Sequence, residues 1–432
     1  LVGGNRHQDF AYVGNAMPNS QQWRDAKRLR KAGMVIVRCA HYPMDPAFMD
    51  ACDELGLFVI VPTPGWQYWN KDPHFGELVH ENTRNIIRRD RNHTCVLMWE
   101  PILNETRYPE DFAIKALQIT KDEFPYPGRP AAVADVQSAG VRDNYDVVYD
   151  WADNIGKGNW PEDKCVFTRE FGEMVDDWYA HNNINRAARS WGERPMLMAA
   201  LSLCDTYGQF IGGCQWHPFD HQRGYHPDTY YGGIYDAFRQ KEYAFEMFRS
   251  QDRNAEPMVF IANEMTQFSD NDVTVFSNCD SVRLTMFEGD KVMTLPVVHD
   301  DNDKPCAPVV FKDFWNFWAA REYSYKQRNW QRVSLLAEGI KDGKVVAVQK
   351  KMPSRRSTKL RLYADDMGRK LNADGSDFIV VVAEVTDDNG NVKRLAKDNI
   401  YFTVEGEGRI IGDGENIMAN PRIVEWGTAP VL

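Results

Sequence analysis

Short apolar runs rich in β-branched residues alternate with amphipathic segments of helical period from the first residue to about Ser250. This alternation predicts a parallel sheet covered by helices. There are eight such runs, which is the number of strands that a closed (βα)8 barrel needs. They occupy residues 1–4, 34–37, 57–61, 95–99, 131–134, 146–149, 165–168 and 210–216. We therefore predict a (βα)8 TIM barrel over residues 1–253.

The pattern changes near residue 253, after which strand-like runs follow one another without helical segments. Residues 272–290, "DVTVFSNCDSVRLTMFEGD", indicate paired strands with a turn at Gly289-Asp290. The dipeptide Asn389-Gly390 is typical of a tight hairpin. These signals predict two small β-sandwich domains, over residues 254–333 and 334–432.

The charge of the chain limits the class of partner. The 51 basic and 62 acidic residues give a net charge of −11, which disfavours a nucleic-acid surface and an anionic membrane. No apolar run approaches the roughly 18 residues of a membrane-spanning helix. The eight cysteines include no Cys-x-x-Cys pair, so we expect buried free thiols. The expected partner is a neutral molecule, with no nucleic acid and no membrane.

The loops that follow the strands of a (βα)8 barrel meet on one face, which holds the active site. Two carboxylates, several basic groups and several aromatic rings follow the predicted strands. Cleavage of a glycosidic bond needs a protonated acid at the leaving oxygen and a second carboxylate at the anomeric carbon, while aromatic faces hold the sugar. The candidate residues, in strand order, are His7, Arg38, His41, Trp66, Trp69, Asn104, Glu105, Tyr149, Arg169, Glu170 and Trp216.

Each candidate also has an ordinary structural explanation. A glutamate at a strand end is usually solvated or ion-paired, Arg38 could be an ion-pair residue at the rim of the core, and Trp216 could be a packing residue. His217, His221 and His226 could suggest a metal cluster, but Pro218 and Gly224 interrupt any helix that would align the first two. We predict no metal site.

Four stretches resemble glycoside hydrolase family 2, which includes β-galactosidases, β-glucuronidases and β-mannosidases. "VRCAHYPMDPAFMDACDELGLFVI" resembles the Arg-x-x-His-Tyr-Pro motif of the family with its following helix and strand. "RDRNHTCVLMWEPILNE" is similar to the signature that ends in Asn-Glu, and "FTREFGE" to the nucleophile strand. The region from "GSDFIVVVAEV" to "RIIGDG" resembles the C-terminal immunoglobulin-like domain of many members. The expected fold is a (βα)8 TIM barrel followed by two all-β immunoglobulin-like sandwich domains.

The resemblance implies a role for each candidate. It makes Glu105 the general acid/base and Glu170 the nucleophile, whose charge we expect to raise the pKa of Glu105. Glu100 would be a supporting residue, and Glu173 would support a loop. The remaining residues would bind substrate or support the nucleophile: Asn104 at the sugar 2-hydroxyl, Arg38 and His41 at the sugar and the nucleophile, Tyr149 as a donor to Glu170, and His7, Trp66, Trp69 and Trp216 around the pocket.

The resemblance further implies a retaining, exo-acting β-glycosidase, foremost a β-galactosidase that removes terminal sugars from polysaccharide-derived oligosaccharides. The alternatives are a β-glucuronidase or β-mannosidase, a non-catalytic carbohydrate-binding homologue, or a structural fragment built on the sandwiches.

No cofactor is expected. The third strand ends "VPTPGWQYW" without the acidic residues that supply magnesium ligands in some members, so a catalytic magnesium is doubtful. We also expect an N-terminal jelly roll and sandwich outside this sequence, a periplasmic or secreted location in a bacterium, and compatibility with an oligomer.

Overall fold

The computed structural model describes residues 1–127, 132–133, 136–149, 164–172, 211–222, 229–230, 232–301, 304–327, 330–412 and 419–432. These residues divide into two compact units, one up to Ala237 and the other from Phe238 onward. The division lies ahead of the boundary that the sequence predicts at residue 253. The difference arises because helix α7 (Tyr243–Arg249) packs against a strand of the second unit.

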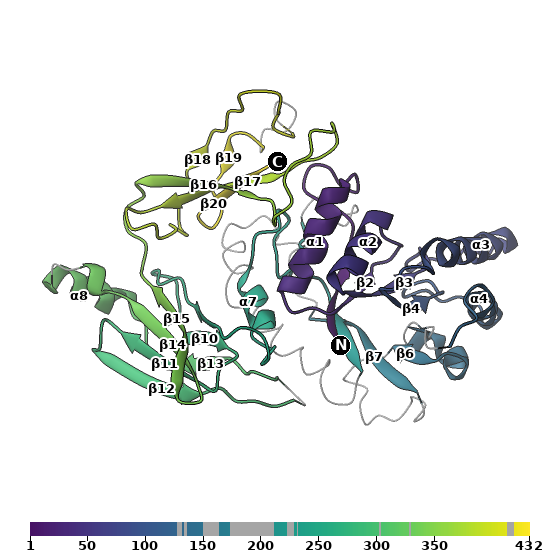
Figure 1. The fold of residues 1–432 in the computed structure, drawn as a ribbon, viewed down its shortest axis with the longest axis horizontal. Helices are drawn as coiled ribbons and strands as arrows, with labels where there is room; N and C mark the ends of the chain where they lie inside the picture. Colours follow the sequence, from purple (N-terminus) through teal and green to yellow (C-terminus); the bar gives the residue numbers. More distant parts are fainter. Residues whose placement is uncertain are drawn as a thin grey trace. The chain divides into compact units, whose positions relative to one another are not determined.

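In the first unit the described strands form one parallel sheet of eight, in the order β4-β3-β2-β1-β8-β7-β6-β5 (Figure 1). The strands at the two ends of this order, β4 and β5, contact each other, so the sheet curls into a barrel. All eight strands overlap the predicted runs, which confirms the TIM-barrel prediction. Their bounds are β1 Val2–Arg6, β2 Ile36–Cys39, β3 Phe58–Pro62, β4 Val96–Glu100, β5 Ala132–Val133, β6 Val147–Tyr149, β7 Cys165–Phe171 and β8 Gly212–Gln215.

Two of the connecting helices, α2 and α3, begin at side-chain caps. The side chains of Asp45 and Asp72 accept hydrogen bonds from the first-turn amides of α2 and α3, each with proline at the start. Gly56 ends α2 in the left-handed conformation, with φ of 70°. The helical segments are α1 Asn19–Lys31, α2 Pro46–Leu55, α3 Pro73–Asp90, α4 Glu110–Glu123 and the 3-10 segment η1 Val136–Asn144.

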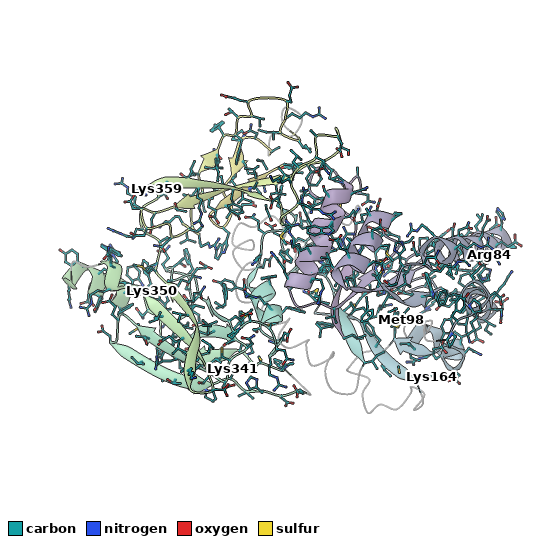
Figure 2. The ribbon with its side chains drawn as sticks, viewed as in Figure 1. Arg84, Met98, Lys164, Lys341, Lys350 and Lys359 are labelled. Atoms are coloured by element: carbon teal, nitrogen blue, oxygen red, sulfur yellow. The ribbon has the colours of Figure 1, made fainter. Side chains whose placement is uncertain are left out.

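The barrel core consists of apolar side chains from β2, β3, β4, β6, β7 and β8, packed with residues of α4 and η1. Met98 of β4, labelled in Figure 2, is one of these buried residues. The described cysteines are free thiols and all except Cys165 are buried. Among the described helices none is long and apolar enough to cross a membrane.

The second unit contains a β-domain formed by a three-stranded sheet, β13-β10-β9, and a four-stranded sheet, β12-β11-β14-β15, around one apolar core. The β11–β12 hairpin turns at Gly289, as predicted, with φ of 122°. The bounds are β9 Val259–Ala262, β10 Val273–Ser277, β11 Ser281–Met286, β12 Lys291–Pro296, β13 Val309–Phe311, α8 Phe317–Gln327, η4 Trp330–Arg332, β14 Leu335–Lys341 and β15 Lys344–Lys351.

The predicted boundary between residues 333 and 334 is wrong, because β14 pairs with β11 and β15 pairs with β14 in the same sheet. Lys341 and Lys350, labelled in Figure 2, mark these two strands.

The remaining strands form a three-stranded sheet, β16-β17-β20, and a two-stranded sheet, β18-β19, with a small apolar core. After β17 the chain reverses through the predicted Asn389-Gly390 turn, where Gly390 has φ of 82° and Asp387 accepts hydrogen bonds from the turn amides. The bounds are β16 Lys359–Asp365, β17 Val380–Thr386, β18 Asn399–Ile400, β19 Arg422–Ile423 and β20 Thr428–Val431.

A partly buried ion cluster connects distant segments of the second unit. Glu264 lies 3.1 Å from Lys351 Nζ and 3.3 Å from Arg394 Nε, and it accepts a hydrogen bond from Tyr243 Oη. Burial acts to raise the pKa of Glu264, but the charges of Lys351 and Arg394 outweigh it and hold the pKa at about 2. A carboxyl group whose pKa is lower in the folded than in the unfolded state stabilises the fold above its unfolded pKa of about 4.3. That stabilisation is lost as the pH falls toward 2.

We predict that Glu264→Gln lowers the free energy of unfolding by about 3 kcal/mol at neutral pH, because Lys351 and Arg394 lose the counter-charge that both share. The difference from the wild type should shrink between pH 4.3 and 2. Urea unfolding followed at a series of pH values measures both effects. Glu322→Gln, which removes an exposed ion pair with Lys326, is the control and should leave the pH dependence unchanged. A loss of stability that does not vary with pH would contradict the prediction.

Candidate active site

Arg38, in β2, is the centre of the hydrogen-bond network at the carboxyl ends of the strands. Its guanidinium is fully buried and donates to side chains from three other strands or the loops that follow them. The contacts are Nε to Glu100 Oε2 at 2.7 Å, Nη2 to Glu100 Oε1 at 2.6 Å, Nη1 to Asn5 Oδ1 at 3.0 Å, Nη2 to Asn104 Oδ1 at 3.0 Å and Nη1 to Glu170 Oε1 at 3.0 Å. One buried cation therefore joins the ends of β1, β4 and β7.

Glu100 is the bidentate partner of Arg38 and has no solvent exposure. Tyr149 Oη donates to Glu100 Oε2 at 2.9 Å, which corrects the expectation that Tyr149 donates to Glu170. Burial and the adjacent charge of Glu100 raise the pKa of Tyr149 well above its usual value. Burial acts to lower the pKa of Arg38, but Glu100 outweighs it and the pKa is raised. Glu100 is thus a structural counter-ion.

Glu105 lies in the loop after β4 and is held by three donors. It accepts hydrogen bonds from Trp66 Nε1 at 2.9 Å, Gln67 Nε2 at 2.7 Å and Arg169 Nη2 at 3.1 Å. Its backbone is left-handed, with φ of 47°, and the preceding Asn104 bridges to Trp66 through the main chain.

The pKa of Glu105 is lowered, contrary to the sequence expectation. Partial burial acts to raise it, but the hydrogen bond from Trp66 and the charge of Arg169 outweigh burial. The expectation considered the charge of Glu170 without the cation between the two carboxylates. In this state the carboxyl group of Glu105 therefore favours the ionised form.

Glu170 is in β7, with its side chain 13% exposed. Its Oε1 accepts from Arg38 Nη1 and lies 3.3 Å from Arg169 Nε. Because Arg169 Nη2 contacts Glu105, a single guanidinium touches both carboxylates. The structure thus brings the two predicted catalytic residues together at one face of the barrel.

Arg169 and Glu170 are consecutive, and consecutive side chains of a regular strand point to opposite faces. The pairing of β7 with β8 shifts register between Thr168 and Phe171, and this irregularity allows both side chains to face the same site.

Arg169 is a candidate from its place at a strand end but has no role predicted from the sequence, and Gln67 and Asn5 are not among the predicted residues. Asn5 is recognisable only from the structure, where its amide donates to the carbonyl of Arg169 at 3.0 Å.

The aromatic candidates separate into two groups. Trp216 is buried and stacks on His41, with ring centroids 5.1 Å apart, and His7 meets the Trp216 ring edge-on at 5.3 Å. His41 Nε2 lies 3.5 Å from Asn104 Nδ2, so these rings adjoin the carboxylate network.

Trp66 is 38% exposed and reaches Glu105, whereas Trp69 packs against Phe75 and Phe112 in an apolar cluster. The structure therefore does not bring Trp69 to the carboxylates.

Within the described part of the chain, the side chains of Asp53, His93 and Cys95 form a group that could hold a metal ion. Cys95 precedes β4, whereas the carboxylate network follows it, so this group belongs to the opposite end of the strand. Asp53 already accepts hydrogen bonds from Thr94 and the Cys95 amide and contacts His93 at 2.7 Å. His226 and Glu173 lie outside the described residues.

Comparison with known proteins gives the class of this chain. Residues 1–157 match the TIM barrel domain of glycosyl hydrolases family 2, and residues 360–422 match glycoside hydrolase family 2 C-terminal domain 5. The chain is 31% identical to a β-galactosidase of Thermoanaerobacter pseudethanolicus, over 100% of this chain and 57% of the relative. The chain thus belongs to glycoside hydrolase family 2, and it spans little more than half the length of that curated relative.

Solved structures share the fold. A β-glycosidase from Bacteroides vulgatus superposes with a TM-score of 0.76 at 18% identity, covering 99% of this chain and 60% of that one. A β-glucuronidase from glycoside hydrolase family 2 superposes with a TM-score of 0.73 at 19% identity, covering 100% of this chain and 45% of that one.

We predict that Arg38→Met lowers the free energy of unfolding by about 3–5 kcal/mol, because it leaves Glu100 buried without a counter-charge. The double variant Arg38→Met/Glu100→Leu should be more stable than Arg38→Met alone, since it removes both charges. Urea unfolding of the single and double variants measures this coupling. Arg88→Met, in an exposed pair with Glu123, is the control and should not change stability. Strict additivity of the two single changes would contradict the prediction.

Proposed function

We propose that the protein containing this chain is a retaining, exo-acting β-glycosidase that removes terminal sugars from polysaccharide-derived oligosaccharides. The observation that carries the proposal is the convergence of Glu105 and Glu170 on the guanidinium of Arg169. Two carboxyl groups that share one guanidinium are close neighbours, as a retaining mechanism requires. The family to which the chain belongs supports the same reaction class.

In the first step Glu170 attacks the anomeric carbon and forms an ester with it. The bond from that carbon to the leaving oxygen breaks, and the proton of Glu105 passes to this oxygen. Arg38 supports the step because its Nη1 orients the ionised Glu170 at 3.0 Å. The carboxyl group of Glu105 must take up its proton before this step, against its lowered pKa.

In the second step water attacks the same carbon, and Glu105 takes the proton of the water as general base. The ester bond to Glu170 breaks, which returns both carboxyl groups to their starting forms and releases the sugar with its original anomeric configuration. A low pKa of Glu105 favours this step, because the base must be ionised when water attacks.

The neighbouring side chains support a sugar pocket. Trp216 and His41 offer stacked rings beside the carboxylates, and His7 lies against them. The side-chain oxygen of Asn104 accepts from Arg38, so its amide is oriented as a donor for a sugar hydroxyl.

We propose a β-galactoside as the substrate. The support is that the relative from Thermoanaerobacter pseudethanolicus, which matches the whole chain, is a β-galactosidase. A β-glucuronide is the second candidate, because a β-glucuronidase of this family shares the fold over the whole chain. Nitrophenyl β-galactoside, β-glucuronide and β-mannoside, each assayed with and without a metal chelator, separate these substrates. We also propose that no metal is needed, so the chelator should not lower the rate. Turnover of none of the three glycosides would contradict the proposed function.

We predict that Glu105→Ala loses about 10²–10⁴-fold in rate on glycosides with poor leaving groups, because the proton donor is missing. Dinitrophenyl glycosides need little protonation to form the ester, so kcat/KM on them should fall much less. Their turnover should recover with azide, a nucleophile that needs no general base. Steady-state rates on both substrate types with added azide provide the measurement. Equal losses on both types would argue against the acid/base role of Glu105.

We predict that a 2-deoxy-2-fluoro glycoside with a good leaving group labels Glu170, because the fluorine slows both steps while the good leaving group speeds formation of the ester alone. Peptide mass spectrometry identifies the labelled residue. With an unmodified glycoside as substrate, proton NMR should show the β-anomer as first product. A label on Glu100, or an α-anomer formed first, would contradict the assignment. Glu170→Gln is the matched control and should take no label.

A further inference from the structure

Arg169 is a buried cation between the two reactive carboxylates, and its side chain is only 3% exposed. Its Nη2 donates to Glu105 Oε1 at 3.1 Å, while its Nε lies 3.3 Å from Glu170 Oε1. Arg169 has no part in the two proposed chemical steps. A buried guanidinium fixed against both reacting groups acts differently on each step, because the charge on each carboxyl group changes during the reaction.

The charges around Arg169 show why its contact matters. Arg38 directs Nε and Nη2 to Glu100, so much of its charge is compensated before Glu105 and Glu170 are considered. Glu100, Glu105 and Glu170 therefore face two guanidinium groups, and Arg169 is the one that contacts Glu105. Arg169 and Arg38 are charged groups that act on Glu105, while Glu170 adjoins it through Arg169 and His41 through Asn104.

We propose that Arg169 is a positioning residue that keeps Glu105 ionised for the second step of the reaction. The inference rests on the proposed function. In the free site Arg169 is shared between two carboxylates. Once Glu170 is esterified, it no longer carries a negative charge. Glu105 then remains as the anionic partner of the Arg169 guanidinium. Arg169 then holds Glu105 as the general base that takes the proton from water.

Arg169 acts unequally on the two steps. The first step needs a protonated Glu105. Arg169 disfavours that protonated form only weakly in this step, because the ionised Glu170 competes for the charge of Arg169. The second step needs an ionised Glu105, which Arg169 favours without that competition. An opposite charge in contact lowers a carboxyl pKa by about 1–3 units. Loss of the charge therefore slows ester hydrolysis and leaves ester formation little changed.

The test uses dinitrophenyl glycosides, for which ester hydrolysis limits kcat, and glycosides with poor leaving groups, for which ester formation limits the rate. In the full chain, Arg169→Met should lower kcat on the activated substrate about tenfold on the acidic limb of the pH profile, because below its pKa a one-unit rise cuts the ionised fraction of Glu105 about tenfold. KM should fall in parallel as the intermediate accumulates, and the acidic limb of kcat should move up by about one pH unit. kcat/KM on the poor substrate should stay nearly constant.

Two further variants complete the design. Arg169→Lys keeps the charge and should return the acidic limb to its wild-type position. Arg88→Met removes a surface ion pair with Glu123 and should leave kcat, KM and the acidic limb unchanged. Arg169→Gln serves as the neutral variant where Arg169→Met does not fold. Equal losses in kcat and kcat/KM with an unmoved acidic limb would overturn the inference and leave the proposed function standing. Absence of turnover by the wild type on every glycoside overturns both.

Discussion

The site depends on the burial of Arg38. A guanidinium removed from water costs several kcal/mol unless its donors are paired, and here they reach partners from three other strand ends. Glu100 supplies the full counter-charge through two short hydrogen bonds, and Tyr149 satisfies Glu100 in turn. The arrangement fixes the position of Glu170, because the Nη1 that contacts it cannot move without breaking the bidentate pair. The geometry of the proposed catalytic site and the stability of the barrel thus depend on the same cation.

This arrangement divides the charged residues of the site into two groups with different functions. Arg38 and Glu100 are both fully buried and neutralise each other, so they act as a rigid support. Arg169 is the second cation and faces Glu105 and Glu170, which change their protonation or bonding during the proposed reaction. The support therefore holds a constant charge, while the charge that Arg169 faces varies from one step to the next.

The sequence predicts the strands and the positions of the carboxylates well, because both depend on local period and on the rule that active sites follow barrel strands. The predicted partner of Tyr149 was wrong, because Glu100 and Glu170 both adjoin Arg38 and only side-chain geometry separates them. The inward orientation of Arg169 was unpredictable, since it depends on a register shift against β8. The predicted domain boundary at residue 333 was wrong, because β14 pairs with β11 through a long-range contact that local turn signals do not indicate.

Exposure orders the three carboxylates in the way that their proposed roles require. Glu100 is 0% exposed, Glu170 13% and Glu105 26%. A permanent counter-ion is best sealed from water, and a nucleophile needs access only to the anomeric carbon. An acid/base must exchange a proton with the leaving group and then with water, so it needs the largest opening. Glu105 obtains that opening from its position in a loop, and the donors Trp66 and Gln67 compensate for the mobility that a loop would otherwise give its side chain.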